Sequence, residues 1–217
     1  MKPNEIKIFT GATIIFSAIV WLIGIITLKA EPISIGSLKA INIAVTVTSA
    51  VWGIYFTIGW KWPYIRKLLF RPNINGTWIG EFKSDWTDEN GNGVPPGRFV
   101  LVIRQTFFSV SIRAFSKKQK TNSYVESLVC DDDRGTKFLA YLYQEKRTTS
   151  VEHGARQGAA ELDLVEESRQ RTLEGEFWTH TGTTGFVRVK QSCTNLCVES
   201  FSEAEDKWPG TDNWANV

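Results

Sequence analysis

The chain has 217 residues, with 25 lysines and arginines against 23 aspartates and glutamates. This length suits one domain of ordinary size plus a membrane anchor. Residues 61–217 carry equal numbers of basic and acidic side chains, which argues against a duplex nucleic-acid binder, because such a protein needs a basic surface to neutralise phosphates.

Two long apolar segments come first along the chain. Residues 8–28 contain no charged side chain, and residues 41–60 form a second uncharged run. A helix needs about 20 apolar residues to cross a bilayer. The first run is also too long for the apolar part of a signal peptide, which has about 7–15 residues. We therefore predict two transmembrane helices in a membrane anchor formed by residues 1–72.

Flanking basic residues predict how these helices are oriented. Lys2 and Lys7 precede the first segment, and a cluster of lysines and arginines between Lys61 and Arg71 follows the second. Because basic flanks stay in the cytoplasm, we expect a multi-pass protein with both termini inside and residues 29–40 outside. Small residues in both spans permit close helix contacts, either within this hairpin or with a second copy.

From residue 74 onward the hydrophobic pattern changes to period two, which is typical of strands. Turn-forming residues separate eight predicted strands, at residues 75–84, 98–105, 107–116, 121–130, 136–146, 158–166, 171–180 and 184–191. Eight sequential antiparallel strands favour an up-and-down, lipocalin-like β-barrel, with a β-sandwich as the alternative. We assign the barrel to residues 73–191, and residues 192–217 to an acidic tail with two tryptophans that is flexible or loosely docked.

Alternation along the strands predicts which side chains point into the barrel. Most of them are apolar, and Trp78 at the start of the first strand is expected to pack against one barrel end. The predicted inward polar and tyrosine side chains are Ser84, Gln105, Ser123, Ser127, Tyr141, Tyr143 and Thr179. Uncharged hydrogen-bonding groups among aromatic walls are typical of a small-molecule pocket, and aromatic rings stack on bases. A polar core that satisfies its own hydrogen bonds is the alternative.

Cysteine and histidine are sparse. Cys130, Cys193 and Cys197 do not make a disulfide framework, and a reducing compartment is the simpler interpretation. The last two cysteines lack the further ligands that a structural zinc requires. His180 has no neighbour placed to make it a general base. We therefore expect no metal, no cofactor and no enzymatic activity.

Six short motifs together resemble a known family. They are Asn75–Trp78, Ile103–Phe107, Ser123–Ser127, Leu139–Tyr143, Leu173–Thr179 and Thr184–Val187, and two apolar spans precede them. With that order and spacing, the chain resembles the CBASS effectors with two transmembrane helices and a β-strand-rich domain, which bacteria encode beside cyclic-oligonucleotide synthases for defence against phage. The resemblance covers about residues 8–191. His180 stands where it leads us to expect an arginine.

The resemblance implies a function. The protein would sit in the bacterial inner membrane, with the barrel in the cytoplasm. The barrel would bind a cyclic di- or oligonucleotide made after infection, the helices would assemble into homo-oligomers in the lipid bilayer, and membrane disruption would cause abortive cell death. A membrane-tethered, lipocalin-like carrier of a lipid or other small apolar ligand is the alternative, and a passive scaffold with a solidly packed barrel is a third.

Overall fold

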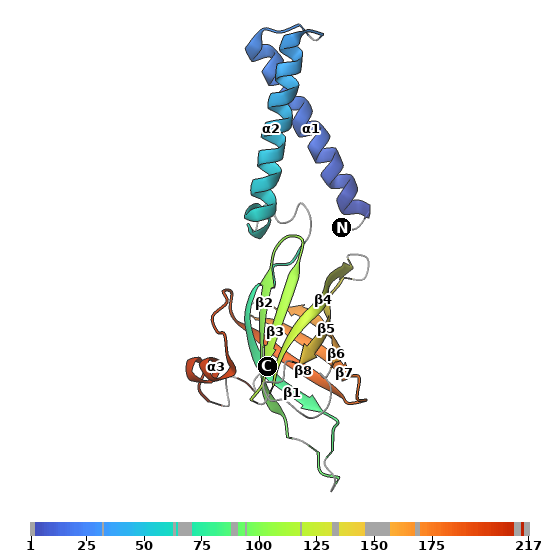
Figure 1. The fold of residues 1–217 in the computed structure, drawn as a ribbon, viewed down its shortest axis with the longest axis vertical. Coiled ribbons are helices and arrows are strands. Elements are labelled where there is room, and N and C mark those ends of the chain that lie inside the picture. The colour runs from blue at the N-terminus through green and yellow to red at the C-terminus, as the bar shows by residue number, and fades with distance from the viewer. Residues whose placement is uncertain are drawn as a thin grey trace. The chain divides into compact units, whose positions relative to one another are not determined.

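The computed structural model describes residues 3–31, 33–62, 64, 71–87, 91–93, 95–117, 119–131, 135–145, 157–167, 170–210 and 214. The chain forms two compact units, Met1–Asn73 and Ile74–Val217. The first is helical and the second contains all the named strands (Figure 1).

The helical unit is a hairpin of α1 (Pro3–Leu28) and α2 (Ile35–Thr57), followed by the short 3-10 helix η1 (Gly59–Lys61). Both long helices are long and apolar enough to cross a membrane. The second helix begins six residues before the predicted start at 41. Ser34 caps it by accepting a hydrogen bond from the Ser37 backbone N–H (3.3 Å), so half of the predicted 29–40 loop is helical. The prediction began the helix after Lys39 because it required an uncharged run. A lysine in the first turns does not break a helix, and the N-cap serine sets the actual start.

Small side chains hold the two helices together. Ala40 and Ala44 of α2 are buried, and a Cβ added to Gly24 of α1 would lie 3.1 Å from the Ala40 Cβ. Ser17 and Thr48 share a hydrogen bond between the two helices (3.1 Å). These residues serve packing within the hairpin, because a close approach of two backbones needs small side chains at the contact.

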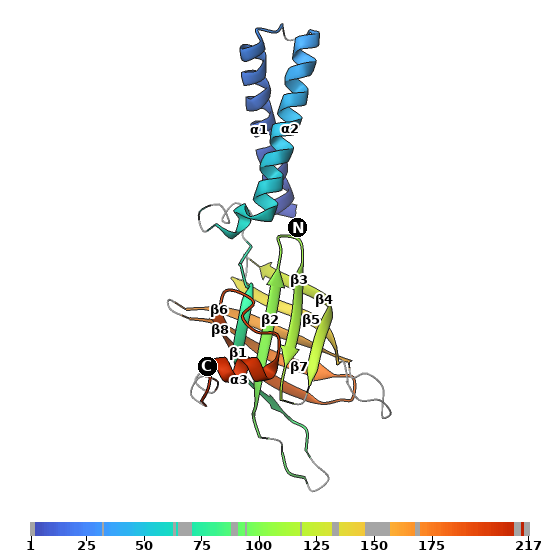
Figure 2. The same ribbon diagram turned by 60° about the vertical axis from the view of Figure 1, so that its left-hand side comes forward.

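The second unit contains a closed antiparallel barrel in the order β1 to β8 (Figures 1 and 2). The strands are β1 (Gly76–Ser84), β2 (Gly97–Gln105), β3 (Val110–Phe115), β4 (Lys120–Asp131), β5 (Thr136–Glu145), β6 (Gln157–Glu166), β7 (Arg171–Thr179) and β8 (Thr184–Cys193). β1 pairs with both β2 and β8, which closes the ring. The predicted up-and-down barrel is confirmed, and the sandwich alternative is wrong.

β3 is the strand whose predicted bounds differ most from the structure. It begins at Val110 rather than at residue 107 because Thr106 to Ser109 form a tight turn. The Thr106 backbone N–H donates to the Ser109 carbonyl (2.8 Å), and the Ser109 N–H donates to Thr106 Oγ1 (3.0 Å). Side-chain hydroxyls that bond the local backbone favour turns over strands, and this motif ends the alternating pattern early.

The described part of the C-terminal segment docks on the barrel, so of the two expectations for it, flexible or loosely docked, the flexible one is wrong. Its helix α3 (Phe201–Lys207) lies across the outside of β1 and β2 (Figure 2). Val198, Ala204 and Trp214 are buried against an apolar outer patch of the barrel. That patch consists of Ile79, Val100, Val102 and Phe115. Burial of these apolar side chains stabilises the docked segment, whereas its many acidic residues had suggested a solvated tail.

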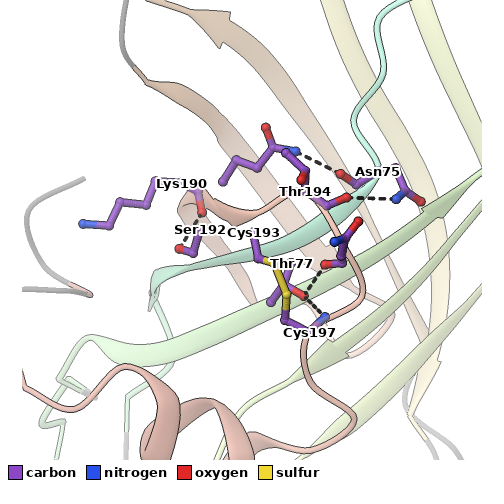
Figure 3. The surroundings of a disulfide bond; sticks show 9 residues. Asn75, Thr77, Lys190, Ser192, Cys193, Thr194 and Cys197 are labelled. Atoms are coloured by element: carbon purple, nitrogen blue, oxygen red, sulfur yellow. Dashed lines mark hydrogen bonds between the residues drawn. A yellow bond between two sulfur atoms is a disulfide. The ribbon is translucent and has the colours of Figure 1, made fainter. Parts of the chain in front are cut away.

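A disulfide between Cys193 and Cys197 closes the turn that leads from β8 into this segment (Figure 3). The three cysteines were predicted to make no disulfide framework, and a reducing compartment was the simpler interpretation; this one pair is nevertheless bonded, while Cys130 is free and buried. β1 holds the turn in place: Thr77 Oγ1 donates to the Asn195 carbonyl (3.2 Å) and accepts from the Cys197 N–H (3.0 Å). These long-range bonds bring the two cysteines together, and spacing alone does not reveal them.

Candidate functional site

The odd-numbered strands begin at one end of the barrel, which we call the sealed end. Trp78 is fully buried there, and its indole Nε1 donates to the Ile74 carbonyl (3.0 Å). Gln105 is 3% exposed, and its side-chain oxygen accepts from the Ile74 N–H (2.7 Å). Gln105, predicted as a ligand-binding residue, therefore ties the start of the barrel together. Its bonds are those of a satisfied core amide.

Charged side chains reinforce the sealed end. Glu166 receives the Lys137 ammonium (2.6 Å) and the Arg171 guanidinium (2.9 Å), and this guanidinium lies 6.0 Å from the centroid of the Trp78 ring. Burial raises the pKa of Glu166, but the hydrogen bond from Lys137 and the charge of Arg171 outweigh it and hold the pKa below its usual range. Both cations are therefore paired with this carboxylate, and the Arg171 guanidinium also contacts the tryptophan ring.

The opposite end, which we call the aromatic end, is built differently. Three aromatic residues lie directly opposite a glycine on the next strand: Phe82 opposite Gly97, Tyr143 opposite Gly158, and Phe177 opposite Gly185. A Cβ added to any of these glycines would lie 2.5 Å from a ring carbon of its partner. The rings therefore lie flat over the glycine backbone, an arrangement known as aromatic rescue. All three rings are only half buried.

These rings form two aromatic walls. Phe82 of β1 makes edge-to-face contacts with Phe99 of β2 (5.7 Å between centroids) and with Phe177 of β7 (6.4 Å). Tyr141 and Tyr143 of β5 form the second wall, with centroids 5.9 Å apart. β1 and β5 stand opposite each other in a ring of eight strands. Two facing aromatic surfaces suit a ligand with two flat groups, because every base can stack on an aromatic face.

Tyr141 is the more deeply placed tyrosine, at 5% exposure. Burial raises the pKa of its hydroxyl well above the ordinary tyrosine value, and the neighbouring Tyr143 raises it further. Its side chain therefore stays neutral across the physiological range. A neutral phenol both donates and accepts hydrogen bonds, which is the property expected of a group that orients a polar ligand.

Three of the other predicted site residues also lie at the aromatic end. Ser84 is half buried opposite Gly185, and its hydroxyl accepts from the Trp86 N–H (3.2 Å). Thr179 ends β7, and its hydroxyl accepts from the Thr183 N–H (3.1 Å) in the β7–β8 turn. Tyr143, Ser84 and Thr179 therefore come together at one mouth of the barrel, away from Gln105 and Trp78.

A bulge in β4 changes the inward set on that strand. The pairing with β5 skips a residue between Ser123 and Val125. Ser123 pairs with Tyr143 and stays on the inner face, but Ser127 pairs with Ala140 and is exposed. The prediction that Ser127 lines the interior is therefore wrong, because one extra residue moves every later side chain to the opposite face.

The same bulge turns Glu126 inward. Glu126 pairs with the buried Tyr141, and the next inward residue on β4, Leu128, packs against the core. Strict alternation had hidden this carboxylate because it assumed an unbroken strand. The Ser123 hydroxyl donates to Glu126 and accepts from the Ile112 N–H (2.8 Å).

Other chemistry-bearing groups lie outside the barrel interior. Arg104 and Arg113 face outward and line an external cavity of about 200 Å³ with Val102, Ser111 and Leu196. Among the described residues, no group of three or more histidine, cysteine or acidic side chains is arranged to hold a metal ion. His180 is exposed in the β7–β8 turn, where its backbone N–H bonds the Gln157 carbonyl (2.9 Å).

Comparison with known proteins assigns the family. Residues 69–191 match the cyclic dinucleotide receptor domain of Cap15. The chain belongs to the Cap15 family. Cap15 is a CBASS-associated protein, so the resemblance derived from the motifs is confirmed. The matched region includes the whole barrel except the last two residues of β8, and it contains both the sealed and the aromatic ends.

Two curated relatives share both parts of the chain. CD-NTase-associated protein 15 of Escherichia albertii is 27% identical over 185 residues, covering 83% of this chain and 88% of the relative. CD-NTase-associated protein 15 of Staphylococcus schleiferi is 24% identical over 190 residues, covering 88% and 97%. Because the coverage exceeds the barrel, the similarity extends beyond the receptor domain.

Proposed function

We propose that this Cap15-family chain is a membrane effector that binds a cyclic dinucleotide at the aromatic end of its barrel. The observation that carries the proposal is the contrast between the two ends. One is closed by Trp78 and a saturated hydrogen-bond network, and the other presents half-buried rings and polar groups. A concave site with apolar walls and a few polar groups is the usual form of a small-molecule pocket.

The proposed ligand has two bases, and the aromatic end has two walls. One base stacks within reach of Phe82, Phe99 and Phe177, and the other lies along Tyr141 and Tyr143. Stacking on an aromatic side chain contributes about 1–3 kcal/mol per base. Ser84, Thr179 and the tyrosine hydroxyls supply hydrogen bonds around the mouth. Binding of this kind needs no catalytic group, and we propose that the chain is not an enzyme.

Ligand binding is proposed to drive assembly of the helices. A ligand shifts an equilibrium only through different affinities for its two states, so the cyclic dinucleotide must bind the oligomer more tightly than the monomer. In the helical hairpin, Gly24, Ala40 and Ala44 are used within one copy. Gly53 has no atom within 4 Å of an added Cβ, which leaves its face of α2 for a second copy. Assembly then disrupts the bacterial inner membrane and kills the infected cell.

The test is thermal unfolding of the full chain in detergent against a panel of cyclic dinucleotides. Ligand at about 100 times its dissociation constant should stabilise the fold by about 2.7 kcal/mol. Tyr143→Ala should abolish the ligand-induced shift. Trp178→Ala is the matched control, because Trp178 is an exposed aromatic on β7, and its shift should be retained. In dye-loaded vesicles the same ligand should cause leakage with the wild type and with Trp178→Ala, but not with Tyr143→Ala.

A second candidate is a carrier of an apolar ligand, which the phenylalanine wall favours. Native mass spectrometry of the purified protein separates the two functions. A co-extracted lipid that no cyclic dinucleotide displaces would support the carrier. Unfolding temperatures unchanged by every nucleotide in the panel, together with intact vesicles, would refute the receptor function.

A further inference from the structure

The bulge in β4 places an acidic side chain on the inner face of the barrel, away from the sealed end where Lys137 and Arg171 pair with Glu166. Glu126 pairs with Tyr141, which is 5% exposed, and Leu128 on the same face packs into the core. The Glu126 side chain itself is half buried. A carboxylate in such a place costs free energy unless it gains hydrogen bonds, so its presence needs an explanation.

The carboxylate is oriented but not neutralised. The Ser123 hydroxyl donates to Glu126 Oε1, and the Ile112 N–H donates to the same hydroxyl (2.8 Å). This chain of bonds fixes Glu126 through the backbone of β3. Within the part of the chain that the structure describes, no lysine, arginine or histidine forms a salt bridge with Glu126. Because each carboxylate oxygen has two lone pairs, Oε1 can accept a second hydrogen bond and Oε2 is also available to a ligand.

The chemistry of the ligand limits what this group can meet. An ionised carboxylate only accepts hydrogen bonds, and it repels the two phosphates of a cyclic dinucleotide. A base edge is therefore the part of the ligand that can face β4. Bases in proteins are read by hydrogen bonds on their Watson–Crick edges together with stacking on aromatic side chains. Tyr141 and Tyr143 on the adjacent strand supply the stacking surface.

Only one of the common bases offers two adjacent donors on that edge. Guanine presents N1–H beside its N2 amino group, which matches the two oxygens of a carboxylate. Adenine and cytosine each pair one amino donor with a ring nitrogen that accepts, and uracil places its single N–H between two carbonyl oxygens. We propose that Glu126 is a specificity-determining residue that selects guanine in the cyclic dinucleotide, with Ser123 as its positioning residue. This inference rests on the proposed function.

Binding of cyclic di-GMP, cyclic di-IMP, cyclic di-AMP and cyclic di-UMP to the full chain in detergent tests the proposal. Inosine lacks only the N2 amino group of guanine. We expect cyclic di-GMP to bind most tightly, and cyclic di-IMP to bind about 5- to 150-fold more weakly, because a good bidentate contact discriminates by about 1–3 kcal/mol. Cyclic di-AMP should be weaker still, because its ring acceptor faces the carboxylate.

Glu126→Gln gives the sharper result. A glutamine carries one acceptor and one donor, which fit adenine better than guanine. The variant should lose affinity for cyclic di-GMP and gain affinity for cyclic di-AMP. The ratio of the cyclic di-AMP dissociation constant to that of cyclic di-GMP should therefore fall by about 10-fold or more. Glu161→Gln on the exposed face of β6 is the matched control, and it should leave the ratio unchanged. Unfolding temperatures check that each variant is folded.

The outcomes distinguish this inference from the function on which it rests. If the protein binds cyclic di-AMP or cyclic di-UMP at least as tightly as cyclic di-GMP, the receptor function stands and guanine selection by Glu126 is refuted. An unchanged ratio in folded Glu126→Gln also refutes it. If none of the four nucleotides binds, the proposed function fails, and the assignment to Glu126 fails with it.

Discussion

At the scale of single residues, glycine decides the shape of the candidate site. Gly97, Gly158 and Gly185 each leave room for an aromatic ring on the neighbouring strand. A larger residue at any of them would push the ring off the barrel wall. The sequence shows these glycines only as strand residues with low β propensity, and their pairing partners explain why they are tolerated.

Gly158→Ala should therefore destabilise the barrel. The new Cβ would lie 2.5 Å from Tyr143 Cζ and 2.6 Å from the Trp178 carbonyl oxygen, and the backbone oxygen cannot rotate away. We expect a loss of about 1–3 kcal/mol in the free energy of unfolding, as for other overpacked sites, measured by urea titration. Gly93→Ala is the control, because no atom lies within 4 Å of its added Cβ. Equal stability of the two variants would contradict this account of the aromatic end.

A second residue-scale prediction concerns acid. Asp85 accepts from the Thr184 N–H (2.8 Å) and from the Thr184 hydroxyl (2.6 Å), linking the end of β1 to the start of β8. These hydrogen bonds hold the pKa of Asp85 below its usual value. A carboxyl whose folded pKa is depressed stabilises the fold above its unfolded pKa of about 3.9, and this contribution is lost as the pH falls through the folded value.

Asp85→Ala tests the acid prediction. Compared with wild type, this variant should unfold at a lower temperature at pH 7. The difference should stay constant down to about pH 5 and shrink below about pH 4, since the unfolded aspartate titrates near pH 3.9. Differential scanning calorimetry from pH 7 to pH 3 measures it. A difference that does not change with pH would mean that the Asp85 charge does not support the hydrogen bonds.

At the scale of the element, two irregularities matter more than the regular strands. The bulge in β4 exchanges Ser127 for Glu126 on the inner face, and the C-terminal segment covers an apolar patch outside β1 and β2. Neither disturbs the ring of strands. Both change which side chains are available, because a bulge shifts the register and a docked helix removes apolar surface from water.

The helical hairpin supports an element-scale prediction about assembly. Gly53→Ile places a branched side chain on the face of α2 that contacts nothing in one copy. We expect it to weaken ligand-induced oligomers in detergent, as judged by sedimentation velocity, because bulky residues keep helix backbones apart in membranes. Val47→Ile is the control, since Val47 lies about 120° around the same helix and is also exposed. Oligomers of normal size in Gly53→Ile would place the contact elsewhere.

At the scale of the whole molecule, the hairpin and the barrel are separate compact units, and the basic residues that flank the helices predict a membrane topology. The loop between α1 and α2 has one basic residue, Lys29, whereas Lys61 and Arg71 follow the second helix. The positive-inside rule predicts a cytoplasmic barrel, which is the location that the proposed function requires for a ligand made in the cell.

Cysteine labelling tests this topology. In a chain whose native cysteines are replaced, Glu31→Cys in the helix–helix loop should react with a membrane-impermeant maleimide on intact bacterial spheroplasts. Asn92→Cys, between β1 and β2, should react only after lysis. The reverse pattern would place the barrel outside the cell and refute an effector that senses a cytoplasmic ligand.

The sequence by itself determined the architecture. Apolar runs of about 20 residues predict helices long enough to cross a membrane, because a bilayer core requires that length. Period-two alternation predicts strands, because side chains alternate across a sheet. The resulting prediction of two helices and an eight-stranded barrel needed no tertiary information. Trp78, Tyr141 and Tyr143 were placed inward by the same alternation, and they are buried or half buried in the structure.

Only the tertiary structure decided how the inner face is divided. Gln105 belongs to the sealed end because its side chain bonds the Ile74 N–H on another segment. Ser127 lies outside the interior because β4 has a bulge in its pairing with β5. The Cys193–Cys197 disulfide and the docked tail likewise depend on β1, more than 100 residues away in the chain. Local patterns record which face a residue prefers, but register and long-range hydrogen bonds arise from pairing between strands, which no single segment encodes.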